Sequence, residues 1–198
     1  MFVSFEGVDG SGKTTQARLL AEGLRAEGRD VVETREPGGT AVGEQVRELI
    51  LGGEALAPWA EAALFAAARA QLVEEVIGPA LARGAHLVCD RYIDSSLAYQ
   101  GLARGLGVDR VLEFNRHATG GLLPDLTFLL VVPLEEARRR RGSASDRIER
   151  EGSDFAAGVD RAYRELAAIF ADRIIVLDGT QPPDDLSALI RGQLRDLS

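Results

Sequence analysis

The segment at residues 7–14 reads Gly-Val-Asp-Gly-Ser-Gly-Lys-Thr and fits the pattern G-x-x-x-x-G-K-[S/T] of a phosphate-binding loop. Such a loop needs a buried strand before it and a helix after it, so the pattern constrains the fold as well as the chemistry. Residues 2–5 are mostly apolar, and apolar residues 17, 20, 21 and 24 recur at helical spacing. At a helix N-terminus, backbone N–H groups and the helix dipole favour phosphate oxygens. We therefore predict a nucleotide site in which Lys13 reaches the terminal phosphates and the Thr14 hydroxyl binds Mg²⁺.

Composition restricts the classes to which the chain can belong. It has 198 residues, 45% of them hydrophobic, which suits one domain over residues 1–198. The net charge of −8 argues against a nucleic-acid partner, because no basic field surrounds the chain. A strand beginning at residue 2 leaves no signal peptide, and no apolar run reaches the length of a membrane span. We therefore expect a cytoplasmic protein without a membrane partner, in which the single Cys89 is a buried strand residue.

Strand-like and helix-like segments alternate along the chain. Apolar runs bounded by turn residues predict strands at 2–5, 31–34, 86–89, 126–132 and 173–177. Helical periodicity predicts helices between and after these strands, including long ones at 41–51, 59–83, 95–101, 108–118 and 134–141. Such alternation produces a parallel sheet with helices on both faces. We predict an α/β fold of the P-loop NTPase type, with a five-stranded sheet and a mobile lid at about residues 138–152.

Four loop segments follow predicted strands, at residues 7–14, 35–40, 90–92 and 178–182. In parallel sheets, ligands bind beyond the carboxyl ends of the strands, so these segments are expected to meet in one pocket. Asp90 and Arg91 follow a buried strand, where the carboxylate can hold Mg²⁺ through water and the guanidinium can grip a phosphate. An ion pair at the strand end, without any ligand, is the alternative.

Two helix faces provide candidates for binding a second substrate. Phe65 and Arg69 are four residues apart, so a flat ring and a guanidinium point the same way and can clamp a base. Ser96, Tyr99 and Gln100 share a face of another helix. Each group also has a simpler interpretation. Phe65 could lie in the core with Arg69 in solvent, and Ser96, Tyr99 and Gln100 could form a polar surface.

The basic cluster at residues 138–141, with Arg147 and Arg150 nearby, is either a solvated helix end or a source of catalytic arginine. We favour catalysis because phosphoryl transfer depends mainly on positioning and charge stabilisation. The phosphate-binding loop itself contains no arginine. A cation beyond Lys13 must therefore come from another segment.

No residue stands out as a general base. His86 opens a buried strand and His117 lies near a helix end, outside every motif. An alcohol acceptor usually needs a base, whereas a phosphate acceptor is already a dianion near neutral pH. The sequence therefore favours a nucleoside monophosphate as the phosphoryl acceptor.

In their order along the chain, these motifs resemble bacterial thymidylate kinase, a family of P-loop nucleoside monophosphate kinases. The resemblance spans residues 2 to about 182 and is carried by FEGVDGSGKTT at 5–15, REPGGT at 35–40, DRY at 90–92, SSLAYQG at 95–101, PDLT at 124–127 and DRIE at 146–149. Together these motifs are highly specific, although single ones are weak. The resemblance implies transfer of the γ-phosphoryl group of ATP to dTMP with Mg²⁺, a step in dTTP synthesis, by a homodimer.

The resemblance also implies which residues bind each substrate. ATP would bind Gly7, Val8, Asp9, Gly10, Ser11, Gly12, Lys13, Thr14, Thr15, Arg138, Gln181 and Pro182. The acceptor dTMP would bind Asp9, Arg35, Pro37, Phe65, Arg69, Arg91, Ser96, Tyr99 and Gln100. Phe65 would stack on thymine, and the Tyr99 ring would disfavour a ribose 2′-hydroxyl. The implied catalytic residues are Lys13, Asp90, Arg91, Arg141 and Arg147, with Mg²⁺ on Thr14 and, through water, on Asp90.

The departures from the family pattern fall mostly around the lid. Residues 133–141 form a short connection, Val131 stands where an aspartate is common, and residues 155–160 lack the usual second Phe and Arg-x-Arg pair. These changes leave open which lid arginine acts. Two other functions remain as alternatives: a deoxynucleoside kinase with Glu6 or Glu36 as base, and a nucleotide switch that controls a partner.

Overall fold

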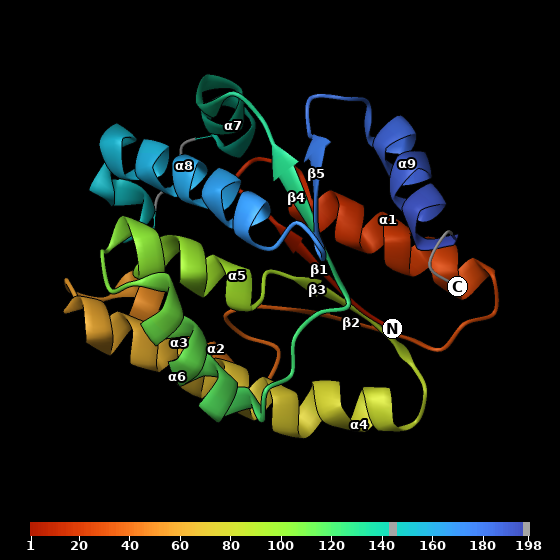
Figure 1. Cartoon of the computed structure of the whole chain (residues 1–198), viewed down its shortest axis with the longest axis horizontal. Helices are drawn as coiled ribbons and strands as arrows, with labels where there is room; N and C mark the ends of the chain where they lie inside the picture. Colours follow the sequence, from red (N-terminus) through yellow and green to blue (C-terminus); the bar gives the residue numbers. More distant parts are fainter. Residues whose placement is uncertain (143–145, 196–198) are drawn as a thin grey trace.

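The structure is a computed structural model that describes residues 1–142 and 146–195. Within these residues, five strands form one parallel sheet in the order β2-β3-β1-β4-β5 (Figure 1). The strands are β1 (Phe2–Glu6), β2 (Val31–Arg35), β3 (His86–Asp90), β4 (Leu126–Val131) and β5 (Ile174–Asp178). The predicted α/β fold and its five strands are confirmed.

The central strand β1 is buried because it is paired on both sides and covered on both faces. Val3 is opposite Val88 in β3 and Leu126 in β4. Since side chains alternate along a strand, Val3 and Phe5 enter the core on one face of the sheet, while Phe2 enters the core on the other. Burial on both faces explains why the central strands have no polar-apolar alternation in the sequence.

One face of the sheet is covered by α1 (Lys13–Ala26) and α9 (Pro183–Arg195) (Figure 1). Their apolar residues recur three or four positions apart and so form one stripe on each helix. Leu20 and Leu24 of α1 pack with Leu186 and Ile190 of α9 against Phe128 and its neighbours in the sheet.

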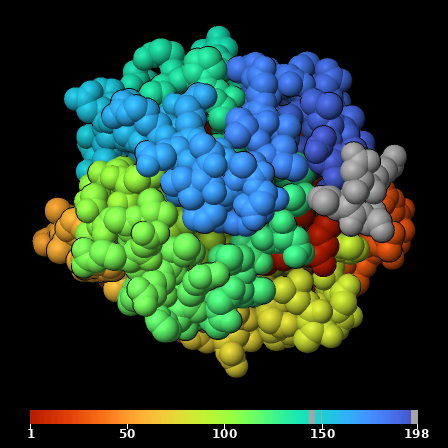
Figure 2. All heavy atoms as spheres, in the orientation of Figure 1, coloured from red at the N-terminus to blue at the C-terminus, as the bar shows by residue number. Residues whose placement is uncertain are grey.

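The other face is covered by α3 (Pro58–Leu72), α4 (Gly78–Ala82), α5 (Ile93–Ser96), α6 (Val108–Thr119) and α8 (Ser153–Ile169). Figure 2, in the orientation of Figure 1, shows this layer beside α9, with only a small area of the red N-terminal segment visible. Helix α2 (Ala41–Gly52) packs on α3 through Val46, Ile50 and Ala68. Helix α7 (Leu134–Arg141) follows β4, and the predicted lid begins in its second half, at about residue 138.

Two predicted helices contain π-helical turns. The predicted helix at 59–83 consists of α3, a π-helical segment η1 (Val73–Ile77) and α4, which has Pro79 in its first turn. The predicted helix at 95–101 starts earlier, as α5, and continues as the π-helical segment η2 (Leu97–Ala103). In the lid, η3 (Glu149–Glu151) is a 3-10 turn, and residues 143–145 lie outside the described residues. Among the described residues, none of the helices has both the length and the apolar composition that a bilayer crossing requires.

Candidate active site

The loop at residues 7–14 passes between β4 and α7 so closely that two of its positions accept only glycine. Gly7 and Gly10 have φ values of 137° and 86°, which residues other than glycine rarely adopt. A Cβ atom on Gly7 would lie 2.4 Å from the Leu130 carbonyl oxygen, and one on Gly10 would lie 2.1 Å from that of Ala137. The loop then leads into α1, which begins at Lys13 with no acidic residue in its first turn. Its N-terminus therefore presents the positive end of a helix dipole to the loop.

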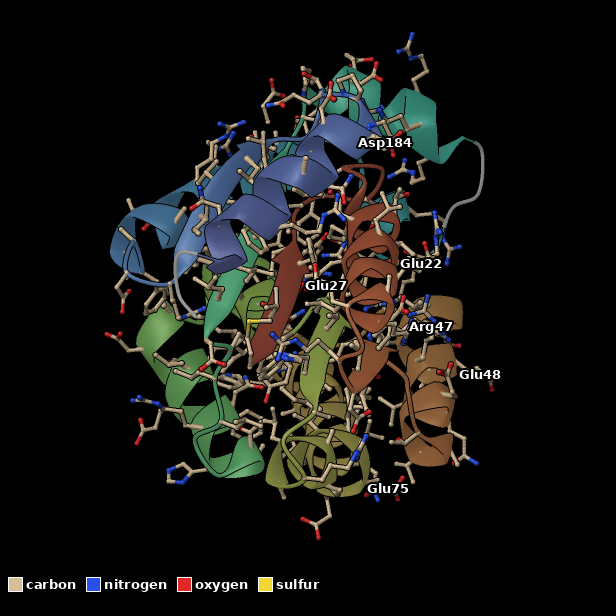
Figure 3. All side chains as sticks on the ribbon, turned by 90° about the vertical axis from the view of Figure 1, so that its right-hand side faces the viewer. Glu22, Glu27, Arg47, Glu48, Glu75 and Asp184 are labelled. Carbon is tan, nitrogen blue, oxygen red and sulfur yellow. The ribbon has the colours of Figure 1, made fainter. Side chains whose placement is uncertain are left out.

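A cleft of about 640 Å³ lies in front of this loop. Its walls include residues from all four loop segments that follow strands, represented by Lys13, Arg35, Arg91 and Gln181. The predicted convergence of these segments at the carboxyl edge of the sheet is therefore confirmed. Arg47 of α2 also lines the cleft, and Figure 3 labels this residue on the orange ribbon of α2.

A second, smaller cavity adjoins the cleft. It is lined by Pro37, Phe65, Tyr99 and Gln100, which were all predicted to bind the acceptor, and by Asp146 and Ile148 of the lid. Asp9, Glu36, Arg47 and Arg91 line both cavities and so form the boundary between them. One cavity is thus dominated by a phosphate-binding loop and the other by aromatic and amide side chains.

Asp9 is held by cations on two sides. Its Oδ1 atom lies 2.5 Å from Nη2 of Arg91 and 3.5 Å from Nζ of Lys13. Burial alone would raise the pKa of Asp9, but Arg91 and Lys13 hold it below its usual value. Burial, together with repulsion from Arg91, lowers the pKa of Lys13. Asp9 is therefore an ionised carboxylate between two cations, of which Arg91 lies at the boundary of the cavities and Lys13 in the cleft.

The Arg91 guanidinium is also fixed from the side of α8. Its Nη1 atom donates to the Ser95 hydroxyl at 3.1 Å and to the Tyr163 hydroxyl at 3.0 Å. Tyr163 and Ser95 donate in turn to Oε2 of the buried Glu6, at 2.8 and 2.6 Å. Burial and the nearby charge of Asp94 raise the pKa of Glu6 to about 7. Arg91 is therefore one end of a network that joins β1, α5 and α8.

Thr14 and Asp90 offer oxygen atoms to a cation. The Thr14 hydroxyl donates to Oδ2 of Asp90, whereas Oδ1 of Asp90 is buried without a hydrogen-bond partner among the described residues. Hydroxyl and carboxylate oxygens are ligands that Mg²⁺ prefers. The described residues contain no group of three or more His, Cys, Asp or Glu side chains around a metal position. A cation here would therefore depend on nucleotide phosphates and water for its other ligands.

Comparison with known proteins agrees with this geometry. The model of the family described as thymidylate kinase matches residues 5–190. The chain belongs to the thymidylate kinase family.

Individual relatives cover nearly the whole chain. The thymidylate kinase of Caldanaerobacter subterraneus subsp. tengcongensis is 50% identical over 182 residues, which cover 91% of this chain and 88% of the relative. That of Bifidobacterium longum (strain DJO10A) is 47% identical over 203 residues, covering 100% and 98%. The crystal structure of thymidylate kinase from Ehrlichia chaffeensis has a TM-score of 0.76 at 34% identity, covering 89% of this chain and 91% of the other.

Most residues predicted to bind substrates in this thymidylate kinase-family chain line a cavity. The predicted ATP residues that line the cleft are Asp9, Gly10, Ser11, Gly12, Lys13, Thr14, Thr15 and Gln181. Val8, Arg138 and Arg141 line a third cavity of about 370 Å³, between the loop, α7 and α8. Gly7 and Pro182 line none of these cavities, and the Gly7 backbone lies against β4.

The second, smaller cavity is called the acceptor cavity below. Of the predicted clamp of Phe65 and Arg69, only one residue lines it. Phe65 lines it, but Arg69 is fully buried and pairs with Glu36 at 2.6 Å. Arg69 also donates to the Ser96 hydroxyl at 3.1 Å, to Asn115 and to the Tyr92 carbonyl oxygen at 3.1 Å. Arg69 and Ser96 therefore lie behind the lining, where Ser95 occupies the wall instead. The expectation that Arg69 and Ser96 face the acceptor directly is not met by this structure.

The lid arginine Arg147 also differs from expectation. Its side chain is buried, donating from Nε to the Ile50 carbonyl oxygen at 2.7 Å and from Nη2 to Glu61 at 2.5 Å. It lines none of the three cavities around the loop. The prediction that Arg147 faces the transferring phosphoryl group is therefore corrected for this structure, in which it is an anchor of the lid.

Sequence reasoning missed two cations of the cleft, Arg47 and Arg140. Arg47 donates to the Pro37 carbonyl oxygen at 3.0 Å, and Arg140 donates to that of Gly179 at 2.8 Å. Arg140 was part of the basic cluster, but periodicity could not distinguish it from its neighbours. Arg47 lies in α2 between Val46 and Glu48, and only tertiary packing brings it to the loop at residues 35–40.

Proposed function

We propose that the chain transfers the γ-phosphoryl group of ATP to dTMP, giving ADP and dTDP. The observation that carries this proposal is the pair of adjoining cavities, one on the phosphate-binding loop and one lined by Phe65 and Tyr99. ATP occupies the first cavity and dTMP the second, so that their phosphates meet at Asp9 and Arg91. The known names of the relatives support the choice of acceptor.

The reaction needs positioning and positive charge. An oxygen atom of the dTMP phosphate attacks the γ-phosphorus, and the bond to the departing ADP oxygen breaks. Lys13 and Arg140 stabilise charge on the ATP side, while Arg35, Arg47 and Arg91 orient the acceptor phosphate. The acceptor phosphate is already ionised, so no side chain has to remove a proton. The buried Glu6 is directed at Ser95 and Tyr163, which argues against its use as a base.

We propose the following assignment of the remaining residues. Gln181 and Pro182 flank adenine, Gly7 to Thr15 surround the phosphates of ATP, and Arg138 and Arg141 close over them when the lid, about residues 138–152, moves. Phe65 stacks on thymine above Pro37, Tyr99 and Gln100. Arg69 and Ser96 support this wall from behind, with a direct contact to the base still a prediction.

Mg²⁺ is the cofactor that this chemistry requires. Thr14 would bind it directly and Asp90 through water, which agrees with the unpartnered Oδ1 atom of Asp90. When bound, Mg²⁺ would neutralise the negative charge that develops on the phosphates during transfer. Lys13 and the loop keep the phosphates in place for this.

We also propose that residues 1–198 form one domain and that two copies of the chain form a homodimer. Large apolar side chains that are more than a third exposed include Val42 and Leu49 of α2, Trp59 of α3 and Phe114 of α6, on helices that pack together. The rings of Trp59 and Phe114 lie 6.0 Å apart, edge to face. Exposed apolar groups of this size favour a partner surface. The acidic composition supports a cytoplasmic enzyme with no nucleic-acid or membrane partner.

A coupled assay of ADP release tests the activity. Purified protein is given MgATP with dTMP, with thymidine or with no acceptor, and a Lys13→Met variant controls for contaminating kinases. We expect rapid ADP release with dTMP alone, and formation of dTDP. Equal release without acceptor would favour a nucleotide switch, and preference for thymidine would favour a deoxynucleoside kinase.

A further inference from the structure

Glu61 is a fully buried carboxylate of α3 that lines none of the three cavities around the loop. An ionised carboxylate is stable in such a place only when donors surround it. Oε1 accepts from Nε2 of Gln100 at 2.8 Å, and Oε2 accepts from Arg104 at 3.0 Å and from Arg147 at 2.5 Å. Burial alone would raise the pKa of Glu61, but its bonds with Arg104, Arg147 and Gln100 lower it.

One of these donors lines the acceptor cavity, and another lies between two residues that line it. Gln100 lines that cavity itself. Arg147 lies in the lid between Asp146 and Ile148, which both line the same cavity. Because Arg147 separates these two residues along the chain, fixing its guanidinium fixes the backbone that presents both of them.

The end of α2 holds the same lid segment. The Arg147 backbone N–H donates to the Leu51 carbonyl oxygen at 2.9 Å, and its Nε atom donates to that of Ile50 at 2.7 Å. Last-turn carbonyls of a helix have no partner within the helix, so a cation there is favourable. Leu51 itself lines the acceptor cavity. The lid segment is therefore bound on the α2 side by backbone atoms and on the α3 side by Glu61.

A second carboxylate completes the cluster. Arg104, from the turn after η2, donates to Glu61 and also to Glu151 at 2.6 Å. Glu151 lies 3.7 Å from Nη1 of Arg147. Two carboxylates thus share two guanidiniums. Neutralising Glu61 would leave Glu151 as the only carboxylate of this group, at the point where α3, the η2 region and the lid meet.

We propose that Glu61 is a positioning residue that sets the affinity for the acceptor nucleotide. It holds Gln100 and the Asp146–Ile148 backbone against the acceptor cavity without touching the substrate. The proposal rests on the proposed function, because it concerns the acceptor site of that reaction. Glu61→Gln keeps the shape of the side chain but replaces one accepting oxygen by an NH₂ group, which cannot accept a hydrogen bond from a guanidinium or an amide. At least one of the donors Gln100, Arg104 and Arg147 therefore loses its bond to residue 61.

The experiment compares Glu61→Gln with wild type and with Ile190→Ala. Ile190 is the stability control: it is buried in the apolar cluster between α1, α9 and the sheet and does not line the acceptor cavity, so its truncation destabilises the fold away from that cavity. We measure KM for dTMP, KM for ATP, kcat, Tm and the hydrogen exchange of residues 146–151. We expect Glu61→Gln to raise KM for dTMP by about tenfold, with KM for ATP within about twofold of wild type, and to speed that exchange. Ile190→Ala should lower Tm and leave KM for dTMP within about twofold.

Two outcomes would overturn the proposal. One is an unchanged KM for dTMP in Glu61→Gln; the other is a parallel loss in both KM values and kcat that Ile190→Ala reproduces. If Glu61→Gln does not fold, Arg147→Ala decides: raised KM for dTMP at nearly normal kcat supports the positioning role, whereas reduced kcat at normal KM contradicts it. Wild-type protein without dTMP turnover would instead reject the proposed function, and with it this inference.

Discussion

Among single residues, Arg91 combines an unusual backbone with several side-chain contacts. Its φ of 72° lies in the left-handed region, which residues other than glycine rarely adopt. This turn directly follows β3, where the Arg91 N–H group donates to the Phe5 carbonyl oxygen at 2.9 Å. The guanidinium then meets Asp9, Ser95 and Tyr163 at the boundary of the two cavities. Strain of this kind is typical of sites where a side chain must have one direction.

Replacing Arg91 by alanine should strongly impair use of the acceptor. Loss of one partner in a charged contact of this type costs about 2–5 kcal/mol, or roughly 30- to 5,000-fold in kcat/KM for dTMP. Steady-state kinetics measure this change, and a fluorescent ATP analogue measures whether the ATP site is retained. Unchanged kcat/KM would remove Arg91 from the site.

The raised pKa of Glu6 predicts a specific pH dependence of stability. In the folded chain Glu6 has a pKa of about 7, against 4.5 for the ordinary group. Burial and the charge of Asp94 raise this pKa, and Arg91 and four hydrogen bonds only partly offset the rise. The contribution of Glu6 to stability is therefore complete below pH 4.5 and is lost as the pH rises through 7, by about 3 kcal/mol in total.

Denaturant unfolding of wild type and Glu6→Gln from pH 4.5 to 8 measures this contribution. As the pH rises, the unfolding free energy of wild type should fall relative to that of Glu6→Gln. A difference that stays constant, or that shifts the other way, would contradict the raised pKa.

At the scale of secondary-structure elements, α7 brings an arginine to the cleft in front of the phosphate-binding loop. The side chain of Arg140 lines the cleft, while its neighbour Arg139 has a side chain that is 78% exposed and pairs with Glu136 of the same helix. Because α7 follows β4 and lies against Gly10, its position is fixed relative to the phosphate-binding loop. The element therefore compensates for the lack of arginine in the loop.

Arg140→Ala should lower kcat by about 10³-fold, the smaller value typical of an arginine that stabilises phosphoryl transfer. The matched control is Arg139→Ala, which removes the same charge from the same helix and should leave kcat within about twofold. Single-turnover kinetics with dTMP distinguish chemistry from product release. Equal effects of the two substitutions would indicate that only the general charge of α7 matters.

Elements were predicted well where local composition decides them. Except for β2, which reads VVETR, the strands are mostly apolar, and α1 and α8 each have one apolar stripe, so composition and periodicity were sufficient. The π-helical segments η1 and η2 have no comparable signal, because they result from packing between helices. The fates of Arg69 and Arg147 were unpredictable for a related reason. Their partners Glu36 and Glu61 are 33 and 86 residues away.

At the scale of the whole molecule, the chain binds two anionic nucleotides despite its net charge of −8. The cleft gathers Lys13, Arg35, Arg47, Arg91 and Arg140 from five different segments. Local cations outweigh the overall charge because distant charges are screened within about 10 Å at 0.1 M salt. The fold concentrates these cations where the carboxyl ends of the strands meet.

The proposed dimer makes a further prediction for the whole molecule. Sedimentation equilibrium should give twice the mass of one chain, and Phe114→Asp on α6 should reduce it to that of one chain. Leu189→Asp is the control, because Leu189 is 46% exposed on α9, which covers the other face of the sheet. A monomeric wild type, or a dimer that only the α9 substitution disrupts, would contradict the proposed surface.

The central claim is that two nucleotides lie end to end across the boundary formed by Asp9 and Arg91. Inhibition by a single molecule in which adenosine and thymidine are joined 5′ to 5′ by a polyphosphate chain tests this claim most directly. We predict that it competes with ATP and also with dTMP, and that it binds more tightly than either nucleotide. Competition with only one of the two substrates would show that the cavities do not form one continuous site.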